Sequence, residues 1–262
     1  MTTIDDLVNS IRNLQSVVVA LSGGVDSALV AVATSLALPE RYLCVTTASY
    51  SLPAQDRDMV EQLVKKFSLK HRFLYIQETE LSEEYVKNPT NRCYYCKSIL
   101  YSQMDLIRSE LGFKWLVNGT QLDDLGDYRP GLQAVNGFPV FSPLLELKVN
   151  KSIVRTMAKE FNVPTWDKPS SPCLASRIPY GTHVTAEKLE QVDACESYLR
   201  NRFDLKIVRV RHYGTKALIQ VGDNLSKVIV DQGLLHFFKQ KGFVEVKLDP
   251  AGYRQGYLNG EI

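Results

Sequence analysis

The residues best suited to chemistry form a glycine-rich turn at positions 22–27, which reads Ser-Gly-Gly-Val-Asp-Ser. The turn follows a β-branched run and precedes an apolar, Ala-rich segment, which is typical of a buried strand that passes into a helix. Such a turn presents backbone N–H groups and the positive end of a helix dipole to an anion. Gly23 and Gly24 let the backbone approach phosphate oxygens.

The polar side chains of this turn extend the prediction. Ser22 and Ser27 can donate hydroxyl groups, and Asp26 can hold Mg²⁺. No lysine follows, so the turn is not the GxxxxGK[ST] loop whose lysine reaches the β- and γ-phosphates. The alternative is an ordinary strand–turn–helix corner in which a serine or an aspartate caps the helix.

Cysteines form a second candidate site. Cys93 and Cys96 make a Cys-x-x-Cys pair, and Cys173 follows a proline in a polar stretch, whereas we expect Cys44 and Cys195 to be buried. A closed zinc site lacks ligands, because there is no second Cys-x-x-Cys and no nearby histidine pair. Three thiolates can hold a [4Fe–4S] cluster and leave one iron without a protein ligand. Alternatively, Cys173 is a nucleophile or sulfur donor, or the three cysteines are unconnected.

Two arginines indicate an anion site. Arg209 and Arg211 are two residues apart in a predicted strand, so both side chains point to one face. Adjacent guanidinium groups repel each other unless an anion lies between them, and they match phosphate or carboxylate oxygens in bidentate fashion. The alternative is a solvated strand face with acidic neighbours.

Further polar residues follow the predicted strands, where a parallel sheet places its ligands. Thr46 and Ser49, at the end of the second strand, are candidate adenosine contacts. Asp123, Asp124 and Asp127 follow the fourth strand, where one of them can order a Mg²⁺-bound water or, alternatively, cap a helix.

Two basic residues have less specific positions. Lys97 can contact an α-phosphate or be a surface lysine near a helix N-terminus. Arg129 either pairs with the neighbouring aspartates or contacts the substrate.

Composition sets bounds on the class of protein. The chain has 262 residues and a net charge of only +2, so nothing favours general nucleic-acid binding. No stretch approaches the roughly 20 apolar residues of a membrane span, and the first residues do not resemble a secretory signal. We therefore expect a cytoplasmic protein, in whose reducing surroundings the five cysteines are not a disulfide framework.

The periodicity of apolar residues predicts the elements that position these sites. Strand-like and helix-like runs alternate in the first part of the chain, which predicts an α/β fold with a doubly wound parallel sheet. Predicted strands cover residues 16–21, 42–48, 72–76, 115–118 and 141–142. Predicted helices cover residues 28–38, 53–67, 97–111 and 152–161.

The pattern changes after a polar, proline-bearing stretch. A helix at 185–201, two strands at 207–212 and 217–221, a helix at 225–241 interrupted near Gly233, and a strand at 244–248 predict a small α+β domain.

The turn at 22–27 resembles the PP-loop of ATP pyrophosphatases, which cleave ATP between its α- and β-phosphates and adenylate a substrate. Nearly the whole chain is similar to LarE-type ATP-dependent sulfur transferases, which make the nickel-pincer cofactor of lactate racemase. The similarity rests on residues 22–27, 94–97, 126–131, 176–181 and 208–211.

The resemblance implies an architecture and a substrate. Residues 1–166 would form a PP-loop domain of the adenine nucleotide α-hydrolase type, and 167–182 an active-site loop. Residues 183–262 would form the small domain, which binds the substrate phosphate and assembles the chain into a homo-oligomer, a ring-like hexamer. The partner would be a pyridinium dicarboxylate mononucleotide, whose carboxylate is adenylated and converted to a thiocarboxylate; the sulfur source is not indicated.

The resemblance also implies roles for individual residues. ATP and Mg²⁺ would be bound by Ala20, Ser22, Gly23, Gly24, Asp26, Ser27, Thr46, Ser49, Lys97 and Gly119. The substrate would be bound by Asp127, Arg129, Ser176, Arg177, Glu196, Arg209 and Arg211. For Glu196 the alternative is an exposed glutamate in a salt bridge.

The cysteines depart from one pattern of this family. In the best-known members a cysteine that matches Cys173 gives up its own sulfur, and partners that match Cys93 and Cys96 are absent. The three-cysteine arrangement instead resembles members and tRNA thiolases that are thought to use a [4Fe–4S] cluster. Sacrifice of Cys173, thiolation of tRNA, and a module that only binds ATP and metal remain the alternatives.

Overall fold

The computed structural model describes residues 3–126, 130–222, 225–254 and 256–258, so Asp127 and Arg129 lie outside the described residues. The chain divides into two compact units. The larger unit comprises Met1–Ser49, Asp56–Glu78 and Asn91–Ser171. The smaller unit comprises Tyr50–Gln55, Thr79–Thr90 and Pro172–Ile262.

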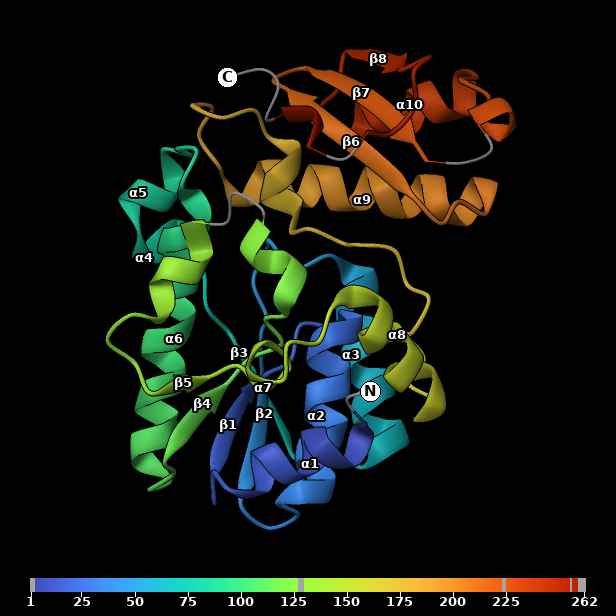
Figure 1. The fold of residues 1–262 in the computed structure, drawn as a ribbon. Helices are drawn as coiled ribbons and strands as arrows, with labels where there is room; N and C mark the ends of the chain where they lie inside the picture. The colour runs from blue at the N-terminus through green and yellow to red at the C-terminus, as the bar shows by residue number, and fades with distance from the viewer. Residues whose placement is uncertain (1–2, 127–129, 223–224, 255, 259–262) are drawn as a thin grey trace. The chain divides into compact units, whose positions relative to one another are not determined.

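A five-stranded parallel sheet forms the centre of the larger unit (Figure 1). Its order is β3-β2-β1-β4-β5, and every neighbouring pair is parallel. The predicted α/β class is therefore confirmed. The strand order reverses between β1 and β4, and ligands of such sheets bind beyond the carboxyl ends of the strands at this point. The strands are β1 (Val17–Ala20), β2 (Tyr42–Thr47), β3 (His71–Leu74), β4 (Trp115–Val117) and β5 (Val140–Phe141).

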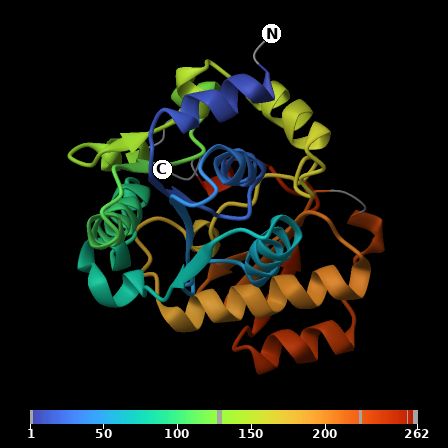
Figure 2. The same cartoon turned by 90° about the horizontal axis from the view of Figure 1, so that it is seen from below.

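Helices cover both faces of this sheet (Figure 2). Val17 and Val19 pack into a core with α1, α2 and α8, whereas Val18 packs on the other face with α6. This alternation follows from the period of two along a strand, and it explains why β1 is apolar throughout. The helices of the larger unit are α1 (Ile4–Arg12), α2 (Val25–Ala37), α3 (Ala54–Phe67), α6 (Arg92–Glu110), α7 (Pro143–Glu146) and α8 (Lys151–Glu160), with the 3₁₀ helices η1 (Leu122–Gly126) and η2 (Pro130–Val135). The short helices α4 (Glu78–Leu81) and α5 (Glu83–Val86) lie almost entirely in the segment that belongs to the smaller unit.

Three predicted helix boundaries are wrong. Helix α2 begins at Val25 rather than at residue 28, so Asp26 and Ser27 lie in its first turn. Helix α6 begins at Arg92 rather than at 97, so the Cys-x-x-Cys pair is helical. The interruption predicted near Gly233 in the helix at 225–241 is present but lies earlier in the chain: a short 3₁₀ helix ends at Lys227, and a new helix begins at Gln232, where Asp231 accepts a hydrogen bond from the backbone N–H of Leu234.

The smaller unit is the predicted α+β structure. Strand β6 pairs antiparallel with β7, and β7 pairs parallel with β8. Helices α9 and α10 pack on this sheet through a core that contains Leu199, Val210 and Phe238. The elements are η3 (Leu174–Arg177), α9 (Ala186–Phe203), β6 (Val208–Tyr213), β7 (Lys216–Val221), η4 (Leu225–Lys227), α10 (Gln232–Gln240) and β8 (Glu245–Leu248).

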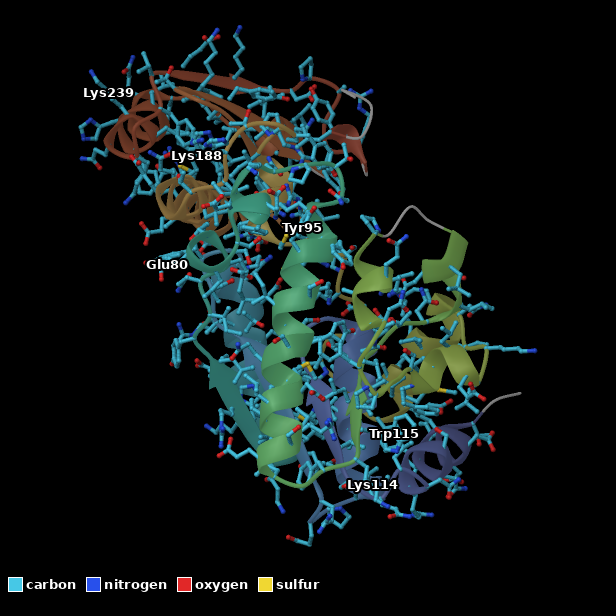
Figure 3. All side chains as sticks on the ribbon, turned by 90° about the vertical axis from the view of Figure 1, so that its left-hand side faces the viewer. Glu80, Tyr95, Lys114, Trp115, Lys188 and Lys239 are labelled. Carbon is cyan, nitrogen blue, oxygen red and sulfur yellow. The ribbon has the colours of Figure 1, made fainter. Side chains whose placement is uncertain are left out.

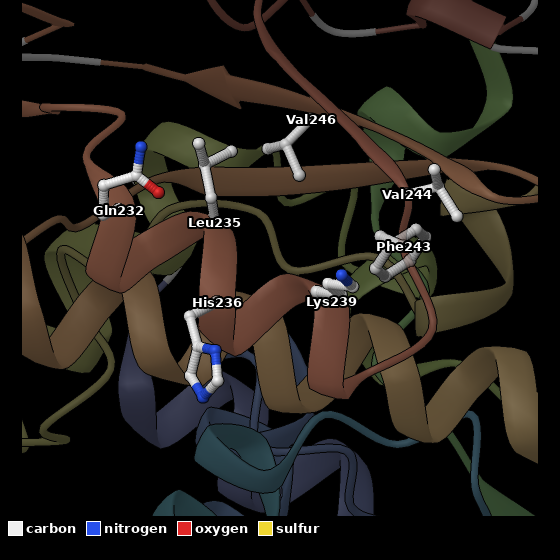
Figure 4. A pocket seen from close by; sticks show the side chains of 7 residues that line it. All are labelled: Gln232, Leu235, His236, Lys239, Phe243, Val244 and Val246. Carbon is white, nitrogen blue, oxygen red and sulfur yellow. The ribbon is translucent and has the colours of Figure 1, made fainter.

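A hollow of about 310 Å³ lies beside α10 and β8 (Figure 4). None of the predicted site residues lines it. Its walls come from Gln232, Leu235, His236, Lys239, Phe243, Val244 and Val246. Among the described helices, none is both long and apolar enough to span a membrane.

Candidate active site

The glycine turn is closed by its own two hydroxyl groups. The hydroxyl of Ser27 donates to the carbonyl of Gly24 at 3.1 Å and accepts the backbone N–H of Ser22, also at 3.1 Å. The hydroxyl of Ser22 lies 3.0 Å from that of Ser27 and must donate to it, because the Ser27 proton is already used. Gly24 is the N-cap of α2 and makes no side-chain cap, so the first N–H groups of the helix are available to an anion.

Two glycines allow neighbouring backbones to approach this turn. Gly23 has a φ of +77°, and a Cβ atom there would lie 2.8 Å from the carbonyl oxygen of Asp56. A Cβ atom on Gly119, which follows β4, would lie 2.7 Å from the backbone nitrogen of Ser27. Gly119 therefore lets the chain after β4 lie directly against the first turn of α2.

Asp26 meets a cation that the sequence did not reveal. The Nζ atom of Lys151 lies 2.7 Å from Oδ1 and 2.5 Å from Oδ2 of Asp26. A second lysine, Lys168, donates to the carbonyl of Gly23 at 2.9 Å and to Oδ1 of Asp56 at 2.7 Å. Both lysines are far from the turn in sequence, and no motif marked them.

Thr46 is brought to the same turn. Its side chain is buried, and its hydroxyl donates to the carbonyl of Leu21 at 2.6 Å. The Nε2 atom of His71, 2.8 Å away, must therefore carry a proton and donate to Thr46. Burial lowers the pKa of His71, although the charge of Glu61 opposes this, so the ring is a neutral support for the turn.

Ser49 and Cys96 meet at one buried carboxylate. The hydroxyl of Ser49 donates to Oε1 of Glu78 at 3.1 Å, and the thiol of Cys96 lies 3.7 Å from the same oxygen. Glu78 is only 4% exposed. Glu78, which the sequence analysis did not identify, therefore contacts both Ser49, a predicted adenosine contact, and Cys96, a predicted ligand of the iron–sulfur cluster.

The Cys-x-x-Cys turn lies at the carboxyl end of the parallel strands. Tyr95, between the two cysteines, lies at the opposite end of the larger unit from Lys114 and Trp115, where β4 begins (Figure 3). Cys93 is exposed and Cys96 is partly exposed.

Gly131, in η2, packs against the same turn of α6. A Cβ atom there would lie 3.2 Å from Cγ of Lys97 and 3.3 Å from the carbonyl oxygen of Cys93. Lys97 is exposed in the second turn of α6. Ala20 is the last residue of β1, just before the glycine turn.

In the smaller unit, Cys173 begins the short helix η3 and is partly exposed. The Nη1 group of Arg177 donates to the carbonyls of Pro172 and Cys173, at 2.6 and 3.0 Å, and to the hydroxyl of Ser176 at 2.9 Å. The fully buried Arg177 therefore fixes the turn that carries Cys173.

A buried cluster of arginines surrounds Glu196. Arg177 forms two hydrogen bonds with the Glu196 carboxylate, at 2.8 and 3.0 Å, and Arg200 forms a third at 2.7 Å. The same carboxylate accepts the backbone N–H of Val210 in β6. Glu196 is 0% exposed, so the alternative of an exposed glutamate is wrong.

Arg209 and Arg211 complete this cluster from β6, where they are 3% and 5% exposed. The solvated strand face, the alternative for these two arginines, is therefore wrong. Arg211 donates to the side chain of Gln220 and to the carbonyl of Ser176, both at 2.8 Å. The ring of Tyr253 lies 5.2 Å from the guanidinium carbon of Arg209.

Among the described residues of this cluster, the arginines repel one another. Burial, together with repulsion from Arg177, lowers the pKa of Arg209 to about 10 and also lowers the pKa of Arg211. Burial would raise the pKa of Glu196, but the arginines outweigh it and the pKa lies below its ordinary value. Such a cluster favours an anion, which would offset the repulsion between the guanidinium groups.

The remaining cysteines are structural, as predicted. Cys44 in β2 and Cys195 in α9 are fully buried. Burial raises the pKa of the Cys195 thiol to about 12, and it also raises the pKa of the Cys44 thiol. Within the described part of the chain, no group of three or more His, Cys, Asp and Glu side chains is placed to hold a metal ion.

Comparison with known proteins places the chain among relatives of similar length. Residues 1–92 match the NAD synthase family. An uncharacterized protein of Synechocystis sp. is 36% identical over 98% of this chain and 96% of its own, and one of Methanocaldococcus jannaschii is 29% identical over 92% and 91%. The pyridinium-3,5-bisthiocarboxylic acid mononucleotide synthase of Lactiplantibacillus plantarum is 32% identical over 98% of this chain and 93% of its own.

Proposed function

This chain belongs to the family of the pyridinium-3,5-bisthiocarboxylic acid mononucleotide synthase, and we propose that it is an ATP-dependent sulfur transferase. It would adenylate a carboxylate of a pyridinium dicarboxylate mononucleotide and replace a carboxylate oxygen with sulfur. The observation that carries this proposal is the glycine turn with the uncapped N-terminus of α2 and the carboxylate of Asp26.

The first half-reaction belongs to the larger unit. A substrate carboxylate oxygen attacks the α-phosphorus of ATP, and the bond to the β-phosphate oxygen breaks to release pyrophosphate. The N–H groups that begin α2 stabilise the charge that develops on the departing pyrophosphate. Asp26 holds Mg²⁺, Lys97 contacts the α-phosphate, and Thr46 and Ser49 support the adenosine.

The second half-reaction needs the substrate in a fixed orientation. The arginine cluster of the smaller unit would bind the substrate phosphate through Arg209 and Arg211, with Ser176 and Arg177 supporting the turn beside them. Buried guanidinium groups with lowered pKa values gain most from a dianion. A sulfur nucleophile then attacks the acyl carbon and AMP departs, which leaves a thiocarboxylate.

We propose three cysteine thiols as ligands of a [4Fe–4S] cluster, because cysteine thiolates are the usual ligands of such clusters. Cys93, Cys96 and Cys173 are at least partly exposed, unlike the two buried cysteines. A cluster held by three thiolates leaves one iron without a protein ligand, and that iron would hold the additional sulfide that serves as the sulfur nucleophile. Glu78 contacts the thiol of Cys96, and Arg177 holds the backbone carbonyl of Cys173.

One observation favours a second candidate for the sulfur source. Cys173 shares its turn with Ser176 and Arg177, which belong to the predicted substrate-binding set. Cys173 itself would then be the direct sulfur donor, and its loss of sulfur would leave dehydroalanine. A decrease in the mass of the chain by one H₂S after a single turnover would favour this candidate.

Exchange of radiolabelled pyrophosphate into ATP tests the first half-reaction. We expect exchange only when the carboxylate substrate is present, and we expect Asp26→Asn to abolish it. Exchange without a carboxylate substrate, or no exchange when that substrate is present, would contradict the proposal.

The content of iron and acid-labile sulfide after anaerobic purification tests the cluster. It is measured in the wild type and in Cys93→Ala. A wild type without iron, together with an active Cys93→Ala variant, would refute the cluster.

A further inference from the structure

Arg211 is held on two sides by the smaller unit itself. Its Nε group donates to Oε1 of Gln220 and its Nη1 group to the carbonyl of Ser176, both at 2.8 Å. The ring of Tyr257 lies 5.4 Å from the guanidinium carbon. Among the described residues, none accepts a hydrogen bond from Nη2. Because the five N–H donors of a guanidinium group lie in one plane, these contacts set the direction in which the Nη2 donors point.

Gln220 reaches Arg211 from the neighbouring strand. It lies in β7 directly opposite Arg209, and therefore diagonal to Arg211, so that the three side chains share one face of the sheet. Gln220 is 0% exposed, and a buried amide needs hydrogen-bond partners within the protein. Its oxygen faces Arg211 and its nitrogen faces Asp249.

Asp249 determines which way this amide faces. One carboxylate oxygen of the buried Asp249 accepts a hydrogen bond from Nε2 of Gln220 at 2.8 Å, and the other accepts the backbone N–H of Ala251 at 2.9 Å. An ionised carboxylate accepts hydrogen bonds and donates none, so only the amide nitrogen of Gln220 can face it. The amide oxygen of Gln220 must then face the Nε group of Arg211.

The consequence for an anion is preorganisation. A long, mobile arginine loses side-chain entropy when it binds a ligand, and an arginine that is already held in place loses less. In this cluster the hold on Arg211 depends on two side chains, Gln220 and Asp249, which come from two different strands or their ends. Neither carries a positive charge, so neither is itself a natural phosphate ligand of the arginine type.

We propose that Gln220 is a positioning residue for substrate binding: Asp249 orients its amide, and the amide oxygen holds Arg211 so that the Nη2 group meets the substrate phosphate. The inference rests on the proposed function, in which Arg211 binds the phosphate of a pyridinium mononucleotide. Two buried side chains that act through Arg211 thereby determine how tightly the phosphate is bound.

Isothermal titration calorimetry with nicotinamide mononucleotide and with nicotinamide riboside tests the inference in the full chain. These two pyridinium compounds differ only in the phosphate. Gln220→Leu should weaken binding of the mononucleotide roughly tenfold, about the effect of one lost hydrogen bond. Binding of the riboside and of ATP should not change, because neither involves Arg211.

Asp249→Asn should weaken binding of the mononucleotide as well, although the change keeps the shape of the side chain. An asparagine has one acceptor oxygen for the two donors that Asp249 now serves, Gln220 and the N–H of Ala251. The amide of Gln220 is then free to turn and to present its nitrogen to Arg211, which cannot accept a hydrogen bond.

A double-mutant cycle separates positioning from a general loss of stability. Arg211→Ala should remove the part of the affinity that depends on the phosphate, and Gln220→Leu should have no further effect in that background. Gln191→Leu is the matched control, because the amide oxygen of Gln191 lies 2.8 Å from Nε2 of His212, the neighbour of Arg211 in β6. This control should bind the mononucleotide within about twofold of the wild type.

Three results would overturn the inference: equal mononucleotide affinity in Gln220→Leu and the wild type, an equal loss in the presence and absence of Arg211, or an equal loss in Gln191→Leu. If Gln220→Leu does not fold, Asp249→Asn decides, and an unchanged affinity in that variant overturns the inference too. A wild type that binds the mononucleotide no more tightly than the riboside would contradict the proposed function instead.

Discussion

Gly119→Ala tests whether the end of β4 controls the position of the glycine turn. The added Cβ atom would lie 2.7 Å from the nitrogen of Ser27, 2.9 Å from the carbonyl carbon of Asp26 and 3.0 Å from Cα of Ser27. All three are backbone atoms, so no side chain can rotate away. Ordinary contacts begin at 3.4 Å, and the first turn of α2 must therefore move away by the difference, about 0.7 Å.

Two effects of different size follow from this movement. Overpacking of this kind typically lowers the free energy of unfolding by about 1–3 kcal/mol. The effect on function should exceed the effect on stability, because a misplacement of about 1 Å in a binding site can lower activity roughly 100-fold. We therefore expect Gly119→Ala to fold, to lose about 1–3 kcal/mol in urea unfolding, and to bind ATP at least about tenfold more weakly.

Gly126→Ala is the control for this experiment. Gly126 ends η1, and a Cβ atom there would meet none of the described residues within 4 Å. Its free energy of unfolding should change by less than about 0.5 kcal/mol and its ATP affinity should be unchanged. A Gly119→Ala variant with the stability and the ATP affinity of Gly126→Ala would show that the turn does not depend on β4, and the reasoning would be refuted.

Two further predictions concern buried charge and thiols. Glu196→Gln should lower the free energy of unfolding at pH 7 by about 3 kcal/mol, because it leaves buried arginines without their counter-charge, whereas the exposed Glu190→Gln in the same helix should have little effect. The folded-state pKa of Glu196 lies below its ordinary value of 4.5. The difference in stability between the wild type and Glu196→Gln should therefore be complete above about pH 4.5 and disappear as the pH falls through the folded-state pKa. A difference in stability that persists unchanged in acid would contradict this prediction. Titration with a thiol reagent at pH 8 should modify three cysteines in the native iron-free chain and all five in urea, because burial and raised pKa values protect the other two. The three cysteines that we expect to react are Cys93, Cys96 and Cys173. Rapid modification of four or five thiols in the native chain would show that Cys44 and Cys195 are not protected by burial.

The parallel sheet could be predicted because its strands are short apolar runs between helix-like segments. Helix α1 was missed, although its signal is present: Thr3 accepts from the backbone of Asp6, and Asp6 accepts from the backbone of Thr3. The start of α6 was missed for another reason. Asn91 begins it without a side-chain cap, so nothing in the local sequence separates the Cys-x-x-Cys pair from a loop.

The sites show the same limit. Residues of one short motif, such as Ser22, Asp26 and Ser27, could be assigned together because their neighbourhood is fixed by the chain itself. Whether Glu196 is buried could not be decided, because its environment depends on Arg177 and on β6, which are distant in sequence. Those partners, rather than the residue type, determine that a carboxylate is stable in the core.

The cation of the glycine turn shows why a distant partner is needed at all. A side chain at Gly23 would meet the backbone of Asp56 at 2.8 Å, so this position cannot carry a lysine. Ala28, which follows the turn, is 1% exposed and packs in the core, where an ammonium group would lose its hydration. The ammonium group that pairs with Asp26 comes instead from another element. Lys151 supplies it across 125 residues of sequence, a separation that no local pattern could reveal.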